Sequence, residues 1–405
     1  MVLMKRASRV EVVYFGAICL LGVVGLLSPT SYSALPAGPI LEGVLIACTI
    51  LIFRAPKARI LPFLALALAY VLISFGLMFL FNPSNLLDFL QAYKAFIYVI
   101  PLCFFYKRDI FSRALSLKVL KFLLVLLLVK YSYSLALDLN PRMGSRPGLF
   151  VENNFELIFA ILYFFTMSDD FGKGRNAWFA LMTTVVLLSG SRSSALALIV
   201  IFGGIYLRYL NMKTIFYLFG LGLLALAAGA LFLSRGYAAG GIESIDRFRF
   251  MMVFLYEIRN WSLFDFALGS FPITALSNES CRALSFYEGL FSYSGDGSCY
   301  SVVLHSYFFR VIFDHGIIGL FFLFAFIAFA LRGSGFSRYR VMIFIGVLSA
   351  SALSVSAMNS VFASLAIALA LGLTRRTEFQ NASSPPESAA RGVTIEPLVQ
   401  RNESV

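Results

Sequence analysis

The chain has 405 residues, of which 60% are hydrophobic and only 13% are charged, and its mean hydropathy is +0.84. A soluble domain usually carries about 25% charged residues, so this composition excludes an ordinary soluble domain and indicates an all-α polytopic membrane protein. The formal net charge of +12 comes from basic residues dispersed over separate loops, and this dispersal argues against a nucleic-acid partner.

A helix needs roughly 20 apolar residues to cross the hydrocarbon core of a bilayer. The chain contains about twelve such stretches, which predict as many membrane-spanning helices. They lie near residues 10–28, 38–53, 59–81, 86–106, 117–137, 152–168, 176–190, 192–210, 214–233, 305–331, 339–354 and 356–373.

Lys and Arg occur in every second loop between these stretches, beginning with Lys5, Arg6 and Arg9 before the first span. Because cytoplasmic loops of membrane proteins are enriched in Lys and Arg, both termini are expected in the cytoplasm. A polar end rich in Pro and Ser follows the last span and is expected to be a disordered cytoplasmic tail. The expected segments are spans one to nine (1–233), a large outer loop (234–304), spans ten to twelve (305–373) and the tail (374–405).

The large outer loop mixes aromatic residues, glycines and charges, so it is expected to fold. Its stretch IDRFRFMMVFLYEIRNW has apolar residues at helical spacing and predicts a helix, whereas LFSYSGDGSCYS predicts a turn or loop. Two of the five cysteines, Cys281 and Cys299, fall in this loop. The sequence leaves open whether they form a disulfide in an oxidising compartment or remain free thiols.

Ionisable residues inside predicted spans are costly and usually face a cavity or a partner. Span four carries a stripe of polar residues at helical spacing: Asp88, Gln91, Lys94 and Tyr98. This stripe either pairs with neighbouring helices or lines a cavity. Lys130 in span five is expected to extend toward the outer membrane surface. Span six begins with a dense polar cluster, Glu152 to Glu156, whose role the sequence leaves open.

An apolar segment before the C-terminal end, LHSYFFRVIFDHGIIGLFFLF, carries four ionisable residues: His305, Arg310, Asp314 and His315. Arg310 and Asp314 are four residues apart, so they share a helix face and can pair. His305 is expected at the outer water boundary, where a neutral imidazole is a suitable general base, although a lone histidine on a helix is more often structural. Gly316 and Gly319 would let another helix approach closely.

Basic residues on the predicted outer face are nearly all arginines: Arg142, Arg146, Arg192, Arg235, Arg247, Arg249, Arg259 and Arg282. Guanidinium groups bind phosphate oxygens with two parallel hydrogen bonds, so these residues suit an anionic substrate. Arg192 lies between small hydroxyl residues at the junction of spans seven and eight, where it is either an interfacial anchor or a phosphate ligand. The large loop itself is slightly acidic, so any anion site must be local.

The segment from His305 to Leu320 resembles the signature of the O-antigen ligase and O-antigen polymerase superfamily. That signature is a His, an acidic residue nine positions later, then Gly and Gly-Leu; here Ser306 replaces the usual Asn after the His, and Asp314 replaces the usual Glu. LSGSRSSALAL resembles the Ser-Arg segment of the family. The stretch from Arg249 to Phe271 resembles the Arg-to-Gly segment that opens the large periplasmic loop of the family.

The resemblance implies a helical fold of the C-type glycosyltransferase kind, with the large periplasmic loop between spans nine and ten, in the bacterial inner membrane. Members of the superfamily transfer a glycan from undecaprenyl diphosphate to an acceptor hydroxyl at the periplasmic face, with inversion and without a metal or other cofactor. The expected partners are the lipid-linked glycan, an acceptor glycan (a growing repeat or the lipid A core), the bilayer and a chain-length regulator protein. The product would be a surface polysaccharide: O-antigen of lipopolysaccharide, capsule or exopolysaccharide.

Carried over by motif, Arg192 and Arg249 would hold the diphosphate, and Arg247 is close enough in sequence to share this task. His305 would accept the proton of the acceptor hydroxyl, while Asp314 would orient Arg310 or His305. Some polymerases carry paired Arg-to-Gly motifs in two outer loops, and this chain lacks that pair, so polymerase and ligase both remain open. The alternative is a polysaccharide flippase or another secondary transporter, although transporters often consist of two related halves and no internal repeat is evident here.

Overall fold

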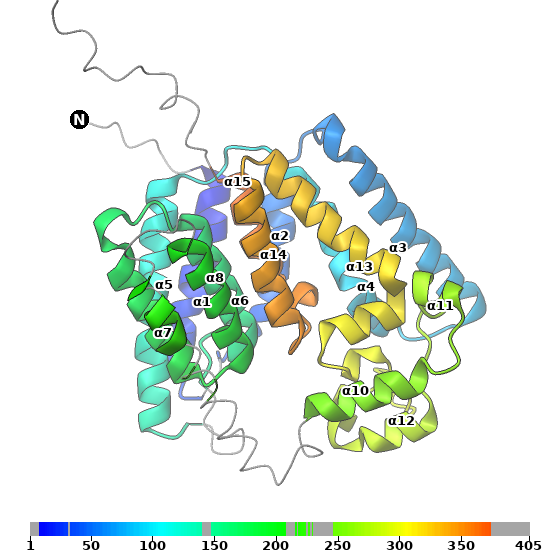
Figure 1. The fold of residues 1–405 in the computed structure, drawn as a ribbon. Helices are drawn as coiled ribbons and strands as arrows, with labels where there is room; N and C mark the ends of the chain where they lie inside the picture. Colours follow the sequence, from blue (N-terminus) through cyan, green and yellow to red (C-terminus); the bar gives the residue numbers. More distant parts are fainter. Residues whose placement is uncertain are drawn as a thin grey trace, which may run out of the picture. The chain divides into compact units, whose positions relative to one another are not determined.

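The computed structural model describes residues 8–30, 33–139, 147–207 and 246–373, together with a few positions between 215 and 229. Throughout these residues the chain forms helices joined by turns and loops, and the described part contains no β-strand. The prediction of an all-α fold is therefore confirmed. Figure 1 shows the arrangement of the helices.

The N-terminal half of the described chain forms eight helices: α1 (Arg9–Leu27), α2 (Ala37–Leu51), α3 (Leu61–Phe81), α4 (Leu86–Phe105), α5 (Arg113–Ala136), α6 (Asn153–Met167), α7 (Arg175–Ser189) and α8 (Arg192–Tyr206). The C-terminal half contributes α10 (Asp246–Glu257), α11 (Leu263–Leu268), α12 (Asn278–Ala283), α13 (Tyr307–Gly333), α14 (Arg338–Ala352) and α15 (Val361–Gly372). Short 3-10 turns include η1 (Ala58–Ile60), η5 (Ser285–Leu290), η6 (Ser301–Val303) and η7 (Ala357–Asn359).

Each apolar stretch that was predicted to span the membrane and lies in the described part coincides with one of these helices. The ninth stretch, 214–233, is described only at scattered positions, so that prediction lies largely outside the described residues. The last stretch is shorter than predicted, because α15 begins at Val361 rather than near residue 356. There the separate turn η7 presents the Asn359 side chain, whose Oδ1 accepts the N–H of Ala95 at 3.1 Å.

Among the residues that the structure describes, length and composition identify four helices that could cross a membrane: α1, α3 extended by η1, α4 and α13. Four further helices, α2, α6, α8 and α15, are apolar but shorter. A 15-residue helix such as α6 is only about 22 Å long, whereas the hydrocarbon core is about 30 Å thick. The described structure thus fits an α-helical membrane protein, but its helix lengths do not match twelve complete spans.

Helices α6 and α15 pack against each other in the interior, and every residue of α15 is buried. Small residues in α15, read in the sequence VFASLAIALALG, allow neighbouring helices to approach closely. In contrast, α3 packs mainly on α4 and exposes a long row of apolar side chains, including Leu66, Leu72, Ile73 and Phe79. An apolar outer face of this kind is expected of a helix in contact with lipid.

Helices α8 and α14 pack side by side and run in opposite directions. Near one end, the Tyr339 hydroxyl contacts the Gly203 carbonyl at 3.4 Å. Farther along, a Cβ placed on Gly346 would lie 3.1 Å from the side chain of Val200. Extending this antiparallel register carries the residues that follow α14 to the beginning of α8, where Arg192 is located.

The large loop predicted between spans nine and ten folds, from residue 246 onward, into α10, α11, α12, η5 and η6 near the start of α13 (Figure 1). Apolar side chains of α10, including Phe250 and Phe254, pack with Leu284, Leu304 and Phe313. A disulfide joins Cys281 to Cys299, so the question that the sequence left open is answered in favour of a bond. The predicted helix in IDRFRFMMVFLYEIRNW is confirmed as α10, and LFSYSGDGSCYS is irregular, as predicted.

Helix α13 is interrupted at Gly316, which has φ 65° and ψ −175°. The end of α11 fits against this interruption, because a Cβ on Gly316 would lie only 2.2 Å from the Ala267 carbonyl oxygen. The N–H of Ser270 donates to the carbonyl of Phe313 at 2.7 Å. The predicted close approach at Gly316 is confirmed, and the partner is the short helix α11. We call residues 246–304, from α10 to the residue before His305, the outer segment, after the outer loop that the sequence predicts there.

Candidate functional site

Arg192 is the first residue of α8 and is half-buried. The N-cap residue before it, Ser191, donates its hydroxyl to Oδ1 of Asn154 at 2.6 Å. The neighbouring Asn153 donates Nδ2 to the carbonyl of Ser189 at 2.8 Å. The polar start of α6 therefore holds the tight junction between α7 and α8, and so fixes the backbone that carries Arg192.

Glu156, one turn farther along α6, is completely enclosed by protein. Its carboxylate accepts the N–H groups of Leu149 at 2.8 Å, Phe150 at 2.7 Å and Val151 at 3.3 Å. It also accepts the Tyr131 hydroxyl at 2.5 Å. The cluster between Glu152 and Glu156, whose role the sequence left open, thus anchors the chain segment that enters α6 and the loop that leads into α8.

Arg247 lies near the start of α10 and donates a hydrogen bond from Nη2 to the hydroxyl of Ser354. Ser354 follows α14, at the end that the antiparallel packing brings to the beginning of α8. Arg247 and Arg192 therefore lie at the same end of the α8–α14 pair. Arg249 is two residues farther along α10, on the other side of that helix, and is exposed.

His305 precedes α13 and is half-buried. Its ring packs edge-on against Phe250, with centroids 5.3 Å apart, and against Tyr287, with centroids 5.5 Å apart. Phe250 follows Arg247 by three residues, so both side chains lie on one face of α10. Helix α10 thus connects the imidazole to the end of α14 and, through it, to the arginine end of α8.

Arg310 and Asp314 lie on α13 and are only 4% and 9% exposed. Their predicted proximity is confirmed, with Nε of Arg310 4.0 Å from Oδ2 of Asp314. The Arg310 guanidinium also donates to the carbonyl of Gln91. Asp314 accepts the hydroxyl of Ser301 at 2.5 Å, and Ser301 belongs to the turn just before His305. Asp314 therefore holds the turn before His305 from inside the protein, while Arg310 attaches α13 to α4.

The second histidine, His315, has a partner on each ring nitrogen. Nε2 lies 3.1 Å from the carbonyl of Ala92, and Nδ1 lies 2.9 Å from the hydroxyl of Tyr70. A carbonyl oxygen can only accept, so the contact with Ala92 assigns the proton to Nε2 and leaves Nδ1 to accept from Tyr70. His315 is therefore a hydrogen-bonded histidine of the interior that joins α13 to α3 and α4.

The polar stripe of α4 pairs with its neighbours. Asp88 accepts the Ser292 hydroxyl at 2.8 Å, and Gln91 donates to the Tyr293 hydroxyl at 2.6 Å. Nζ of Lys94 lies 2.5 Å from the Glu42 carboxylate. The stripe thus attaches α4 to α2 and to the outer segment, as the first of the two interpretations expects.

The prediction that Lys130 extends to the membrane surface is wrong. The residue is fully buried, and its Nζ donates to the carbonyls of Ser28 at 2.9 Å and Thr30 at 2.7 Å. These carbonyls lie where α1 ends and cannot be paired within the helix. The lysine satisfies them from α5, an interaction that connects residues far apart in the sequence.

The outer segment also contains a capping box, in which Ser262 and Asp265 exchange hydrogen bonds at the start of α11. The backbone N–H and hydroxyl of Ser262 hold the pKa of the Asp265 carboxyl below its usual range. The carboxylate therefore stays charged under ordinary conditions and keeps the first turn of α11 in place beside the interruption of α13.

Two residues of this end of the protein were not identified from the sequence. Ser354 binds Arg247, and Ser301 binds Asp314. The signal for Ser354 was present in the run SASALSVSAMNS, which crosses the junction of the last two predicted spans and is unusually dense in hydroxyl residues. Ser301 had no comparable signal. It precedes α13, which carries its partner Asp314, so helical spacing does not relate the two residues.

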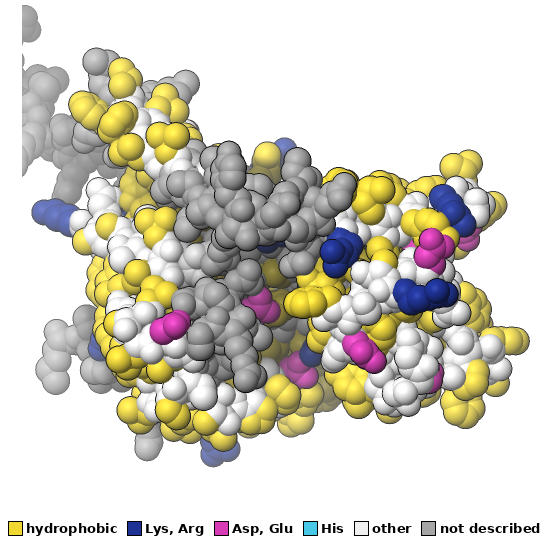
Figure 2. Space-filling model, turned by 90° about the horizontal axis from the view of Figure 1, so that it is seen from below, with side chains coloured by type: hydrophobic (Ala, Val, Ile, Leu, Met, Phe, Trp, Pro, Cys, Tyr) yellow, Lys and Arg dark blue, Asp and Glu magenta, His cyan; other side chains and the backbone are white. Residues whose placement is uncertain are grey.

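The face that includes α10 and α12 carries few basic side chains, and acidic side chains lie among them (Figure 2). An anion would therefore be bound by individual guanidinium groups rather than by a broad positive surface. Among the described residues, no three His, Cys, Asp or Glu side chains gather as metal ligands. Arg247 bonds to Ser354, and Phe250 of the same helix contacts the ring of His305, so α10 links a guanidinium, a hydroxyl and an imidazole group. A guanidinium can bind an anion, and a neutral imidazole can accept a proton.

Compared with known proteins, the chain matches no family model, and none of the curated proteins is similar enough to count as a match.

Proposed function

We propose that the chain is a glycosyltransferase of the O-antigen polymerase or ligase type, with about twelve spans in the bacterial inner membrane. It would transfer a glycan from undecaprenyl diphosphate to an acceptor hydroxyl at the periplasmic face. The observation that carries the proposal is that Arg247 bonds to Ser354 and that Phe250, on the same face of α10, packs on the ring of His305. The antiparallel packing of α8 and α14 puts Arg192 toward the Ser354 end of that helix pair.

In the proposed reaction, Arg192 and Arg247 bind the diphosphate oxygens of the lipid-linked donor. Arg249, which the sequence also predicted as a diphosphate ligand, is exposed on the other side of α10 from Arg247 and takes no part. The acceptor oxygen attacks the anomeric carbon while the bond from that carbon to the diphosphate oxygen breaks, which inverts the configuration. His305 accepts the hydroxyl proton. The diphosphate leaves as a stable anion, and guanidinium groups stabilise the charge that develops on it.

Asp314 and Arg310 act as positioning residues in this mechanism. Asp314 binds the Ser301 hydroxyl, and so holds the turn that leads to His305. Arg310 is fixed by the carbonyl of Gln91, which also accepts from Nδ2 of Asn359 at 3.3 Å. This network connects α4, α13 and the turn before α15 beneath the proposed reaction site.

The disulfide supports the proposed location. Cys281 and Cys299 are bonded in the segment that carries Arg247 and His305. Disulfides persist in oxidising compartments such as the bacterial periplasm and are rare in the cytosol. The Lys- and Arg-rich loops, in contrast, belong to the opposite face by the charge distribution of membrane proteins.

Glycan transfer by purified protein, with a fluorescent undecaprenyl-diphosphate oligosaccharide as donor, tests the proposal. We expect His305→Ala to lower the rate by about 100-fold or more, the loss typical of a missing general base. Arg247→Lys keeps the charge but cannot form two parallel hydrogen bonds, so it should raise KM for the donor. The control is Arg259→Gln, which removes an exposed arginine whose guanidinium lies over the ring of Tyr256.

Full transfer by His305→Ala would remove the general-base role. A deletion strain then distinguishes the subtypes. Single repeats on the lipid carrier indicate a polymerase, and long chains held on the carrier indicate a ligase. A strain whose polymer accumulates on the cytoplasmic side with unchanged length would instead support the transporter alternative.

A further inference from the structure

A polar cavity of about 190 Å³ lies at the opposite end of α8 from Arg192. Its lining comes from the end of α6, the start of α7, the end of α8 and the start of α14: Phe165, Ser168, Asp169, Arg175, Gly204, Ile205, Tyr339 and Arg340. Gly204 follows Arg192 by about 18 Å along the helix axis, at 1.5 Å per residue. The cavity is therefore separate from the candidate glycan-transfer site.

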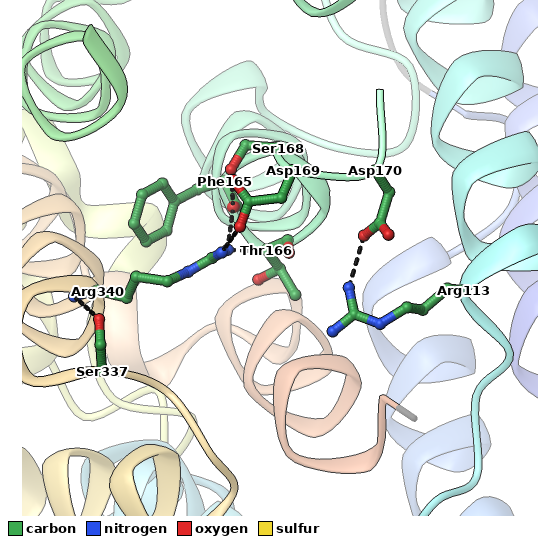
Figure 3. A network of polar contacts seen from close by, with 8 residues as sticks. All are labelled: Arg113, Phe165, Thr166, Ser168, Asp169, Asp170, Ser337 and Arg340. Carbon is green, nitrogen blue, oxygen red and sulfur yellow. Dashed lines mark hydrogen bonds and ion pairs between the residues drawn. The ribbon is translucent and has the colours of Figure 1, made fainter. Parts of the chain in front are cut away.

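Arg340 enters this cavity from α14 and is fixed by α6 (Figure 3). It forms an ion pair with Asp169, and its Nη2 donates to the carbonyls of Phe165 at 2.8 Å and Thr166 at 3.1 Å. Nε of Arg340 is buried and finds no acceptor among the described protein atoms. The two Nη atoms of this guanidinium are therefore bonded to the protein, while its Nε–H can still donate a hydrogen bond.

Arg175 enters the same cavity from the first turn of α7. Its guanidinium lies over the ring of Tyr206, 5.4 Å from the ring centroid. Its Nε is also buried without an acceptor, and no carboxylate of the described chain lies within ion-pair distance of it. Gly174, at the N-cap, offers no side-chain acceptor to the first turn of α7. The positive end of the α7 dipole therefore lies beside the positively charged Arg175.

The two nearby carboxylates are already paired. Asp169 binds Arg340, and Asp170 lies 2.6 Å from Nη1 of Arg113 (Figure 3). Lys121 adds another cation nearby, over the rings of Phe171 and Trp178. The positive charge of Arg175 therefore has no counter-charge in the described structure, which makes this cavity suitable for an anion.

We infer that this cavity binds a phosphate group, held between the guanidinium groups of Arg175 and Arg340. Both residues line the cavity, and guanidinium donors match the oxygens of a phosphate. One water takes about 30 Å³ in the liquid, so the cavity has room for a phosphate group together with bound water.

The phosphate can belong to an anionic phospholipid or to a soluble compound. Basic pockets between helices at the cytoplasmic side of a membrane bind acidic headgroups, and the Lys- and Arg-rich loops around this cavity indicate that side. The inference does not depend on the proposed glycan transfer, because none of the residues involved belongs to that site.

Native mass spectrometry of the purified full-length protein tests the inference. Phosphatidylglycerol, phosphatidylcholine and inorganic phosphate serve as separate probes. We expect the wild type to retain phosphatidylglycerol better than phosphatidylcholine, and Arg175→Gln to weaken this retention by about tenfold, the effect of losing hydrogen bonds to a charged group. Arg175→Lys should fall between the two. The matched control is Arg338→Gln, which removes an exposed arginine of α14 that does not line the cavity.

The outcomes separate the two sources. Retention of phosphatidylglycerol that depends on Arg175 supports a lipid headgroup. Binding of inorganic phosphate that depends on Arg175, without retention of the lipid, supports a soluble ligand. Equal binding by wild type and Arg175→Gln, or equal loss in Arg175→Gln and Arg338→Gln, overturns the inference. If Arg175→Gln does not fold, the test is the modification of Arg175 by phenylglyoxal in the wild-type protein. The inference is contradicted if neither phosphatidylglycerol nor inorganic phosphate protects Arg175 from this modification.

Discussion

At the scale of single residues, buried polar side chains satisfy backbone groups that helices and loops leave unpaired. The Glu156 carboxylate accepts three successive N–H groups before α6, and the Lys130 ammonium binds two carbonyls where α1 ends. A buried backbone group without a partner is strongly destabilising, and the effect is greater where no water is available. These charged residues are therefore part of the fold, whereas the sequence left the role of the Glu152–Glu156 cluster open and predicted that Lys130 extends to the membrane surface.

Replacing Glu156 with alanine tests this role. We expect Glu156→Ala to lower the free energy of unfolding by about 3 kcal/mol, since one unsatisfied buried donor costs about 1–3 kcal/mol and several are exposed together. The measurement is thermal or denaturant unfolding in detergent. Glu288→Ala is the control, because Glu288 is exposed, and it should change stability much less. Equal stability of the two variants would show that the N–H groups find other acceptors.

The sequence predicted contacts between near neighbours better than contacts over long distances. The proximity of Arg310 and Asp314 follows from helical spacing and is observed. The two carbonyls that Lys130 binds belong to Ser28 and Thr30, just after α1 and about a hundred residues earlier in the chain, and nothing in the local pattern points to them. For the same reason, the bond between Arg247 and Ser354 could not be predicted, although each arginine could be recognised as a candidate.

At the scale of elements, the interruption of α13 joins the outer segment to the helices. Gly316 adopts a backbone conformation that is essentially restricted to glycine, and Gly269 at the end of α11 approaches it with φ 85°. The N–H of Ser270 then bonds to the carbonyl of Phe313. This contact places the outer segment over the part of α13 that carries Arg310 and Asp314.

We expect Gly316→Ala to destabilise the protein by about 3 kcal/mol or more, because the backbone conformation alone costs about 1–3 kcal/mol for other residues and the Cβ would overlap Ala267. Gly76→Ala in α3 is the control, since a Cβ there meets nothing within 4 Å. Alanine is also the better helix former, so the control should be neutral or slightly stabilising. Thermal unfolding of both variants in detergent decides, and a stable Gly316→Ala protein would contradict the packing of α11 into α13.

Hydropathy predicted where the helices lie, because each helix buries or presents apolar side chains along its whole length. It did not predict that α6, α8 and α15 are too short to cross a bilayer without help, since neighbouring apolar loop residues extend the pattern beyond the helix ends. The pairing of α8 with α14 could not be predicted from the sequence either. It depends on Gly204, beside which Ile343 packs, and a single glycine in an apolar stretch does not identify its neighbour.

At the scale of the whole molecule, two independent features predict the same orientation of the protein in the membrane. Lys and Arg gather in alternate loops, which predicts that the phosphate cavity faces the cytoplasm. The disulfide between Cys281 and Cys299 predicts that the outer segment, with Arg247 and His305, faces an oxidising compartment. The proposed glycan transfer and the inferred phosphate binding then take place on opposite faces.

Labelling with a membrane-impermeant maleimide tests this arrangement in cells with a permeabilised outer membrane. Cys281 and Cys299 should remain unlabelled until an impermeant reductant is added and should then both react, because they are bonded on the outer side. Cys48 and Cys103 should not react, since they are buried in helices. The matched probe for the other face is Lys173→Cys, at an exposed position beside the phosphate cavity, which should react only after the inner membrane is opened. Reaction of Lys173→Cys while the inner membrane is intact would show that the orientation is opposite to the predicted one. His305 would then face the cytosol, away from the periplasmic face at which the proposed glycan transfer takes place.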